Sequence, residues 1–171
     1  MKIVELNQSY LFQASQLVNS VFLDEDEEVL PARELQASLD PELLRNYQIT
    51  QDDDIRSFQY YVAVSEHQVM GIIGLYELNS DFDKNDWIGW FCVDERYRGQ
   101  RIGIQLLNYA VQQSKHRGKE NLLLYTSTHE NELKAQQLYD ANEFHIIKTM
   151  PKDGYSLMYR QKKLNSTGIE Q

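Results

Sequence analysis

The fold of this chain is decided by one stretch, residues 87–118, which reads WIGWFCVDERYRGQRIGIQLLNYAVQQSKHRG. The residues at 87–93 are rich in aromatic and β-branched side chains and are bounded by polar turn residues, which is typical of a strand. From Ile102 onward, apolar residues recur about every 3.6 positions, which predicts an amphipathic helix. Gly118 can end that helix in a left-handed cap. The stretch therefore predicts a strand, a basic turn and a helix in succession.

The turn between this strand and this helix is suited to an anion. The first N–H groups of a helix have no partner within the helix and lie at its positive end. Gly99 allows the backbone to approach a bound group closely, and Gly103 keeps the first helical turn free of side-chain bulk. Arg98 and Arg101 add positive charge. These residues indicate a phosphate site, while an ordinary strand–helix junction with surface arginines stays open as the alternative.

Two motifs in this part of the chain resemble those of the GCN5-related N-acetyltransferase (GNAT) family. Residues 98–103, RGQRIG, resemble its R/Q-x-x-G-x-G/A signature, and residues 135–144, AQQLYDANEF, are similar to its A-x-x-L/F-Y-E-K-x-G-F block. One helix and one strand separate the two motifs, as in the family. The sequence departs from the family pattern at three places: Arg101 and Glu143 each replace a glycine, and the asparagine that opens the second block is displaced to Asn131.

Length and composition predict one globular domain. The chain has 171 residues, of which 42% are hydrophobic and 25% charged, and a chain of this size can bury a full core. We assign residues 1–161 to a single domain and residues 162–171 to a polar C-terminal tail. The acidic run at 24–28 is expected to be a solvated loop.

The remaining elements follow from periodicity and turn signals. Strands are predicted at 1–6, 58–65, 69–78, 121–128, 144–150 and 154–161, and helices at 7–22, from Pro31, from Asp40 and at 132–142. The strand at 121–128 should run parallel to that at 87–93, because a helix connects them. This order agrees with the fold that the resemblance implies. That fold is a mixed α/β fold with a central mixed sheet of about seven strands, flanked by helices, in which the fourth and fifth strands are parallel and splay apart.

Charge and apolar patterning exclude several classes of function. The formal net charge is -9, which disfavours binding to nucleic acid or to anionic membrane. No segment has the roughly 18 apolar residues of a membrane span, and we expect a cytoplasmic protein. The single cysteine, Cys92, excludes an internal disulfide and is expected to be buried. The four histidines are too scattered to predict a metal site.

The resemblance implies acetyl-CoA as co-substrate. Its pyrophosphate would be held by the backbone N–H groups of residues 98–104, and its pantetheine would pair with Cys92 and Val93 like an extra strand. The predicted cofactor-binding residues are Cys92, Val93, Arg98, Gly99, Gln100, Arg101, Ile102, Gly103, Ile104 and Asn131. Arg101 is compatible with this role if its φ is negative. Glu143 replaces a glycine that serves a turn, so the path into the last strands is expected to differ from that of the family.

The implied chemistry is direct transfer of the acetyl group to a neutral amine in a ternary complex. A backbone N–H near Val93 would stabilise the oxyanion, and Tyr139, at the family's tyrosine position, would be the general acid, unless it is a core tyrosine. Many relatives carry a glutamate on the central strand, which this chain lacks. Glu77 and Asp86 are weak candidates for the general base, with surface carboxylates as the alternative, and His129 is a weaker one.

The acceptor is predicted to be a primary amine on a small molecule or peptide. Acidic loops at 24–28, 52–54 and 81–86 favour a cationic acceptor, although acidic residues retained for solubility would give the same pattern. The competing function is a non-catalytic acyl-CoA-binding or protein-interaction module that keeps the fold. The chain is expected to be a monomer or a homodimer, without nucleic-acid or membrane partners.

Overall fold

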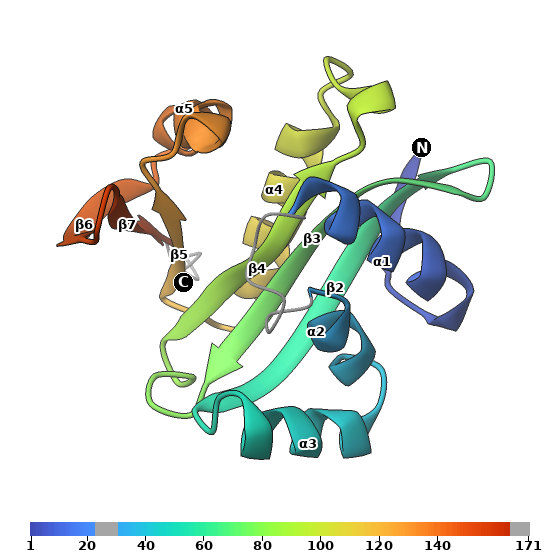
Figure 1. Cartoon of the computed structure of the whole chain (residues 1–171), viewed down its shortest axis with the longest axis horizontal. Helices are drawn as coiled ribbons and strands as arrows, with labels where there is room; N and C mark the ends of the chain where they lie inside the picture. Colours follow the sequence, from blue (N-terminus) through green and yellow to red (C-terminus); the bar gives the residue numbers. More distant parts are fainter. Residues whose placement is uncertain (23–30, 165–171) are drawn as a thin grey trace, which may run out of the picture.

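A computed structural model describes residues 1–22 and 31–164 (Figure 1). Seven strands of this described part form one sheet with the order β1-β2-β3-β4-β5-β7-β6. All neighbours are antiparallel except β4 and β5, which are parallel. The predicted mixed sheet with a parallel fourth and fifth strand is therefore confirmed. The strands are β1 (Lys2–Glu5), β2 (Ile55–Ser65), β3 (Gln68–Leu78), β4 (Asn85–Val93), β5 (Asn121–Ser127), β6 (His145–Pro151) and β7 (Ser156–Lys163).

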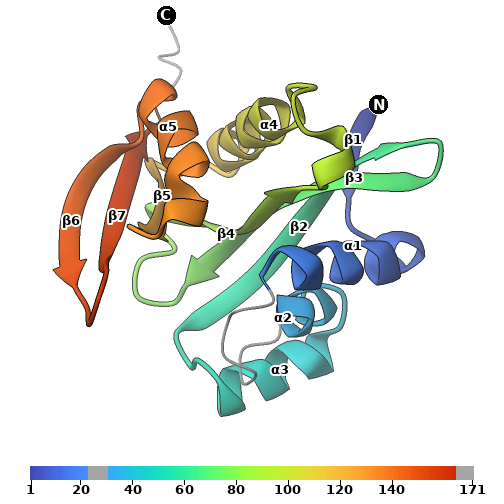
Figure 2. The ribbon, with the colours of Figure 1, turned by 45° about the horizontal axis from the view of Figure 1, so that its top comes forward.

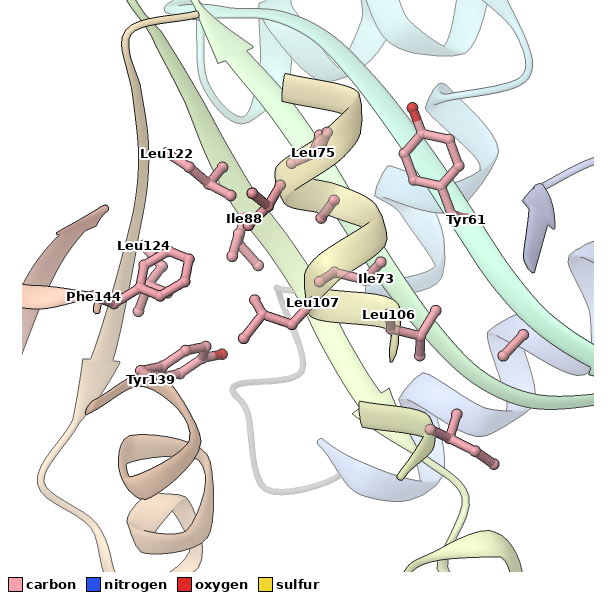
Figure 3. Packing of buried hydrophobic residues seen from close by; sticks show 14 of the residues in the cluster. Tyr61, Ile73, Leu75, Ile88, Leu106, Leu107, Leu122, Leu124, Tyr139 and Phe144 are labelled. Carbon is pink, nitrogen blue, oxygen red and sulfur yellow. The ribbon is translucent and has the colours of Figure 1, made fainter. Parts of the chain in front are cut away.

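Helices cover both faces of this sheet (Figures 1 and 2). On one face lie α1 (Gln8–Val21), α2 (Pro31–Ala37) and α3 (Pro41–Thr50). Their buried residues form a core with β2 and β3 that includes Val18 and Leu35. On the other face lie α4 (Ile102–His116) and α5 (Leu133–Ala141), whose core includes Leu106 and Leu107 (Figure 3). The site described below lies at β4, which stands between these two helix layers.

Local signals in the sequence account for the helix starts. Asn7 caps α1 by accepting the backbone N–H of Ser9 at 3.0 Å. Asp40 caps α3 by accepting the backbone N–H of Glu42 at 2.8 Å, and Pro41 occupies the first helical position. The acidic run at 24–28, predicted to be a solvated loop, lies outside the described residues.

Several element boundaries differ from the sequence-based prediction, and three of them show a common cause. β2 begins at Ile55 rather than Phe58, and β4 begins at Asn85 rather than Trp87. The predicted tail boundary at Lys162 is wrong, because β7 continues to Lys163 and Leu164 is buried. In each case, pairing with a neighbouring strand extends a segment whose own residues look polar.

The backbone is left-handed at both positions where the chain lacks a family glycine. Arg101 has a φ of 62° and Glu143 has a φ of 65°. The condition of a negative φ at Arg101 is therefore not met, although its backbone N–H is a free donor within the described residues. Glu143 adopts a glycine-like conformation, and β6 begins two residues later at His145. Both side chains carry the steric cost that a glycine would avoid.

The parallel pair β4 and β5 separates after a short contact. Only Asn85 to Trp87 of β4 are in register with β5, where they face Asn121 to Leu123. Farther along β4, Ile88 pairs with Leu75 of β3 and Phe91 pairs with Ile73. Three steps along β4 therefore match two steps along β3, so β4 contains one extra residue, a β-bulge. The predicted splay is present. No helix in the described ranges, 1–22 and 31–164, is long and apolar enough to span a membrane.

Candidate functional site

The C-terminal half of β4 presents unpaired backbone groups to the gap between β4 and β5. Asp94 donates its backbone N–H to the carbonyl of Met70 in β3 at 2.9 Å. Hydrogen-bonded residues alternate along an antiparallel ladder, so Cys92 bonds to β3 through its backbone, whereas Phe91 and Val93 turn their N–H and C=O groups to the gap. Of the two residues predicted to pair with pantetheine, Val93 fits that role. The backbone groups of Cys92 face β3 instead, and those of Phe91 face the gap.

The turn between β4 and α4 offers a run of free backbone donors. Among the described residues, the six backbone N–H groups from Gly99 to Ile104 donate no hydrogen bond. The first backbone N–H of α4 that does so belongs to Gln105, which donates to the carbonyl of Arg101 at 3.2 Å. This run contains the predicted residues Gly99, Gln100, Arg101, Ile102, Gly103 and Ile104. Six donors at the positive end of a 15-residue helix suit a phosphate group.

Gly103 opens this helix end toward the gap. A Cβ at this position would lie 3.7 Å from Val93 of β4 and 3.9 Å from Leu138 of α5. A side chain there would therefore project between β4 and α5. A glycine at 103 keeps that space free, as the sequence predicted.

Tyr139 projects from α5 into the same region. Its ring centroid lies 6.4 Å from that of Phe91 in β4 and 5.7 Å from that of Phe144. Figure 3 shows its hydroxyl pointing from α5 toward Leu107 of α4. Burial, together with the Glu132 carboxylate, holds the pKa of Tyr139 well above its ordinary value. The hydroxyl therefore keeps its proton at neutral pH and can act as a donor.

A cleft of about 1790 Å³ extends from this gap over the α1 side of the sheet. Its walls come from α1, the β4–α4 turn, β5 and the segment before α5. Of the predicted cofactor residues, Arg98 and Asn131 line it, and the others lie outside its walls. His129, the weaker base candidate, also lines the cleft, and its ring lies 4.7 Å from that of Tyr155.

Side chains before and within α5 form hydrogen bonds with the backbone at the end of β5. The backbone N–H of Ser127 donates to the carboxylate of Glu132. The carbonyl of Ser127 accepts a hydrogen bond from the Gln136 amide at 2.6 Å. Both backbone groups at the end of β5 are therefore satisfied without a strand in the gap.

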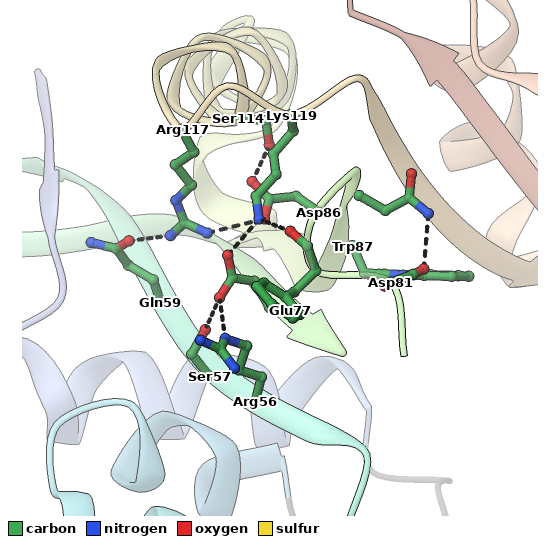
Figure 4. Close-up of polar contacts among 12 residues, drawn as sticks. Arg56, Ser57, Gln59, Glu77, Asp81, Asp86, Trp87, Ser114, Arg117 and Lys119 are labelled. Carbon is green, nitrogen blue, oxygen red and sulfur yellow. Dashed lines mark hydrogen bonds and ion pairs between the residues drawn. The ribbon is translucent and has the colours of Figure 1, made fainter. Parts of the chain in front are cut away.

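The structure does not bring Glu77 and Asp86 to this site. Both belong to a network at the opposite end of β4 (Figure 4). Asp86 is fully buried, accepts the Ser114 hydroxyl at 2.7 Å and pairs with Arg117 at 3.1 Å. Glu77 pairs with the buried Lys119 at 2.6 Å. Asp86 lies in β4 rather than in the predicted loop, and about 23 Å of strand separates it from Val93.

These two carboxylates act as structural anchors. Partial burial alone would raise the pKa of Glu77. The pKa is nevertheless lowered, because Lys119 and Ser57 donate hydrogen bonds to the carboxylate and Lys119 carries a positive charge. A carboxylate that is already ionised and paired is a poor proton acceptor. The network joins β2, β3, β4 and the end of α4 at the base of the splay. The prediction of either residue as a general base is withdrawn.

Comparison with known proteins decides the family. A family model described as the acetyltransferase (GNAT) family matches residues 21–144. This chain belongs to the GNAT family. Membership confirms the resemblance carried by the two motifs and makes the protein an acetyl-CoA-dependent N-acetyltransferase, with acetyl-CoA as co-substrate. No curated protein matches the chain.

Solved structures share this fold over almost the whole chain. An aminoglycoside 6'-N-acetyltransferase from Enterococcus faecium is 16% identical, with a TM-score of 0.71 over 96% of this chain and 98% of that one. An aminoglycoside 6'-N-acetyltransferase complexed with coenzyme A is 15% identical, with a TM-score of 0.68 over the same shares. A GNAT acetyltransferase from Staphylococcus aureus Mu50 is 23% identical, with a TM-score of 0.67 over 96% and 99%. At these identities, the likeness shows the fold alone.

Two features of the structure around β4 were not predicted from the sequence. Phe91 presents its backbone to the gap, which the strand register alone could have indicated. Glu34 of α2 lies partly buried against the sheet, where it accepts hydrogen bonds from two tyrosines. No signal in the sequence marked Glu34, because its partners come from distant segments. In the described part of the chain, no group of three histidine, cysteine, aspartate or glutamate side chains is arranged to hold a metal ion.

Proposed function

We propose that this GNAT protein transfers acetyl from acetyl-CoA to a primary amine by direct attack within a ternary complex. One observation carries the proposal: the unpaired edge of β4, the free N–H groups before α4 and the Tyr139 side chain all converge on one gap. Acetyl-CoA supplies an acetyl thioester, an acyl donor that a neutral amine can attack.

The residues around the gap fit this co-substrate. The six free N–H groups from Gly99 to Ile104 would hold the pyrophosphate, with Arg98 adding charge from the cleft wall. The exposed edge of β4 at Phe91 and Val93 would pair with the pantetheine amides, as a strand would. Asn131 lines the cleft and is proposed to contribute a further polar contact.

Two donors would act on the reacting atoms. The Val93 N–H faces the gap and is proposed to stabilise the oxyanion that forms at the acetyl carbonyl. The Tyr139 hydroxyl is proposed to protonate, or to donate to, the departing sulfur, and its raised pKa supports a protonated side chain at neutral pH. Glu77 and Asp86, which were predicted as general bases, lie at the far end of β4 and are not proposed for that role.

The acceptor is proposed to be an amine, on a small molecule or a peptide. The names of two structural neighbours, both aminoglycoside 6'-N-acetyltransferases, support an amine-bearing acceptor. Two of the acidic loops also have local roles. Asp54 accepts the Ser80 hydroxyl at 2.6 Å, and Asp81 accepts the Trp87 indole N–H at 3.0 Å. The negative charge of these loops still favours a cationic acceptor, and the two hydrogen bonds stabilise the loops.

The experiment measures CoA thiol release across a panel of primary amines for wild type and for Tyr139→Phe. We expect kcat to fall about 10²- to 10⁴-fold, because the hydroxyl acts on the leaving sulfur. The affinity for acetyl-CoA, measured by calorimetry, should stay nearly unchanged. Tyr109→Phe is the matched control, since this α4 tyrosine packs on Tyr61 in the same core, at 5.1 Å between ring centroids.

Two results would contradict the proposal. A kcat of the Tyr139→Phe variant within a factor of about two of wild type would make Tyr139 a packing residue. Binding of acetyl-CoA without thiol release for any amine of the panel would favour a non-catalytic acyl-CoA-binding module.

A further inference from the structure

Glu34 of α2 places a carboxylate against the sheet without a cationic partner. Its two oxygens accept the Tyr47 hydroxyl at 3.0 Å and the Tyr60 hydroxyl at 2.9 Å. Within residues 1–22 and 31–164, no lysine, arginine or histidine forms an ion pair with it. The indole N–H of Trp90 also lies near this carboxylate but is buried without a regular hydrogen bond. The Glu34 carboxyl group is thus surrounded by neutral donors alone.

The Tyr60 ring positions this carboxylate over the bulge of β4. The ring lies across two glycines, Gly74 of β3 and Gly89 of β4. A Cβ at Gly74 would come within 2.3 Å of the ring, and a Cβ at Gly89 would come within 3.0 Å of the hydroxyl. The Tyr60 hydroxyl and the Glu34 carboxylate bonded to it therefore lie above the part of β4 that leads into the gap.

Aromatic rings connect Glu34 to the cleft. Phe22 lines the cleft, and its ring centroid lies 4.7 Å from that of Trp90. On the other side, Tyr47 meets Phe58 at 5.1 Å, Phe58 meets Tyr76 at 6.3 Å and Tyr76 stacks on Trp87 at 6.1 Å. The carboxylate is thus set among aromatic faces on the sheet face opposite α4.

A negative charge at Glu34 would be costly to the fold, so the choice of a glutamate at this position favours a functional role. Burial raises the pKa of Glu34, and the hydrogen bonds from Tyr60 and Tyr47 offset this only in part. A neutral glutamine would accept the same two hydroxyls without the desolvation of a charge. Unpaired carboxylates in partly buried sites are candidates for ligand binding.

We infer that Glu34 binds an ammonium group of the acceptor, whose carbon skeleton packs on the surrounding rings. A carboxylate supplies the opposite charge, and aromatic faces attract cations and pack against apolar carbon. The acceptor class is therefore a cationic amine with an apolar portion. This inference rests on the proposed acetyl transfer, because it names the group that recognises the acceptor of that reaction.

The test compares two pairs of probes that differ only in charge: 2-phenylethylamine with 2-phenylethanol, and 1,5-diaminopentane with 1,5-pentanediol. Binding is followed by tryptophan fluorescence in the full chain saturated with CoA. The chain has two tryptophans, Trp87 and Trp90, and both lie in β4. We expect at least one amine to bind wild type more tightly than its alcohol. Glu34→Gln should weaken that amine about 10- to 100-fold, as expected for the loss of a charged hydrogen-bond partner.

Three controls separate recognition from structure. Glu42→Gln removes an exposed carboxylate from α3 and should leave amine binding unchanged. Tyr47→Phe removes one hydrogen bond to Glu34 but keeps the charge, and should weaken the amine less than Glu34→Gln does. In turnover, Glu34→Gln should raise the KM of the amine and leave the KM of acetyl-CoA unchanged.

The outcomes are distinct. If neither amine binds wild type more tightly than its alcohol, or if Glu34→Gln binds amines as wild type does, the inference is overturned. If acetyl-CoA still binds and is turned over in that case, the proposed function stands without it. Glu34→Gln could instead lower the melting temperature and weaken binding of the amine and of the alcohol by the same factor. In that case Glu34 is a structural anchor of α2, and the inference is also overturned.

Discussion

Arg101→Gly should stabilise the protein, because Arg101 has a φ of 62° at the start of α4. A left-handed backbone costs a non-glycine residue roughly 1–2 kcal/mol. Glycine in turn loses roughly 0.5–1 kcal/mol more conformational freedom on folding. The Arg101 side chain is exposed and makes no hydrogen bond or ion pair within the described ranges. The difference predicts a gain of about 0.5–1 kcal/mol in the free energy of unfolding.

The assay is thermal and urea unfolding of the protein without ligand. For a domain of this size, the gain corresponds to a rise of about 1–4 °C in Tm. Arg101→Ala is the matched control, because alanine removes the same charge but keeps the strained backbone. It should be no more stable than wild type. A glycine variant that is less stable than the alanine variant would refute the assignment of strain to position 101.

Two further predictions concern the sheet that supports the site. Asp86→Asn should lower the free energy of unfolding by about 3 kcal/mol or more, since it leaves Arg117 without its buried partner. The control is Asp83→Asn, which removes an exposed carboxylate. Equal losses of stability in the two variants would contradict this prediction. Gly74→Ala should cost about 1–3 kcal/mol, because its Cβ would overlap the buried Tyr60 ring at 2.3 Å. Gly103→Ala, whose nearest neighbour is at 3.7 Å, is the tolerant control, and equal stabilities for the two variants would show that Tyr60 can shift.

Features set by short-range pattern could be predicted from the sequence. The strand, turn and helix at 87–118 follow from the change of hydrophobic period, which is a local property. The cap residues Asn7 and Asp40 mark helix starts for the same reason. The parallel pairing across α4 follows from connectivity, and the two motifs identify the family. Tyr139 was found through its motif, while its direction toward the gap depends on how α5 packs.

Features that depend on the meeting of distant segments could not be predicted. Asp86 and Glu77 are close to the central strand in sequence, but only the sheet shows that they lie at its far end. Glu34 stands out only through its hydrogen bonds with Tyr47 of α3 and Tyr60 of β2. Its own surroundings in the sequence resemble any amphipathic helix. The left-handed backbone of Arg101 and Glu143 is marked only by the glycines of the family pattern at these positions, because arginine and glutamate themselves rarely adopt it.

The central claim is that acetyl-CoA binds at the start of α4, and calorimetry of acetyl-CoA binding to Gly103→Glu tests it most directly. A glutamate at 103 would place a carboxylate between β4 and α5, where the phosphate and pantetheine are proposed to lie. A carboxylate in the first turn is compatible with the helix dipole, so the fold should persist. Gln112→Glu adds the same charge at an exposed position near the other end of α4. We predict that Gly103→Glu abolishes measurable binding while Gln112→Glu binds as wild type does; wild-type affinity in a folded Gly103→Glu variant would contradict the account.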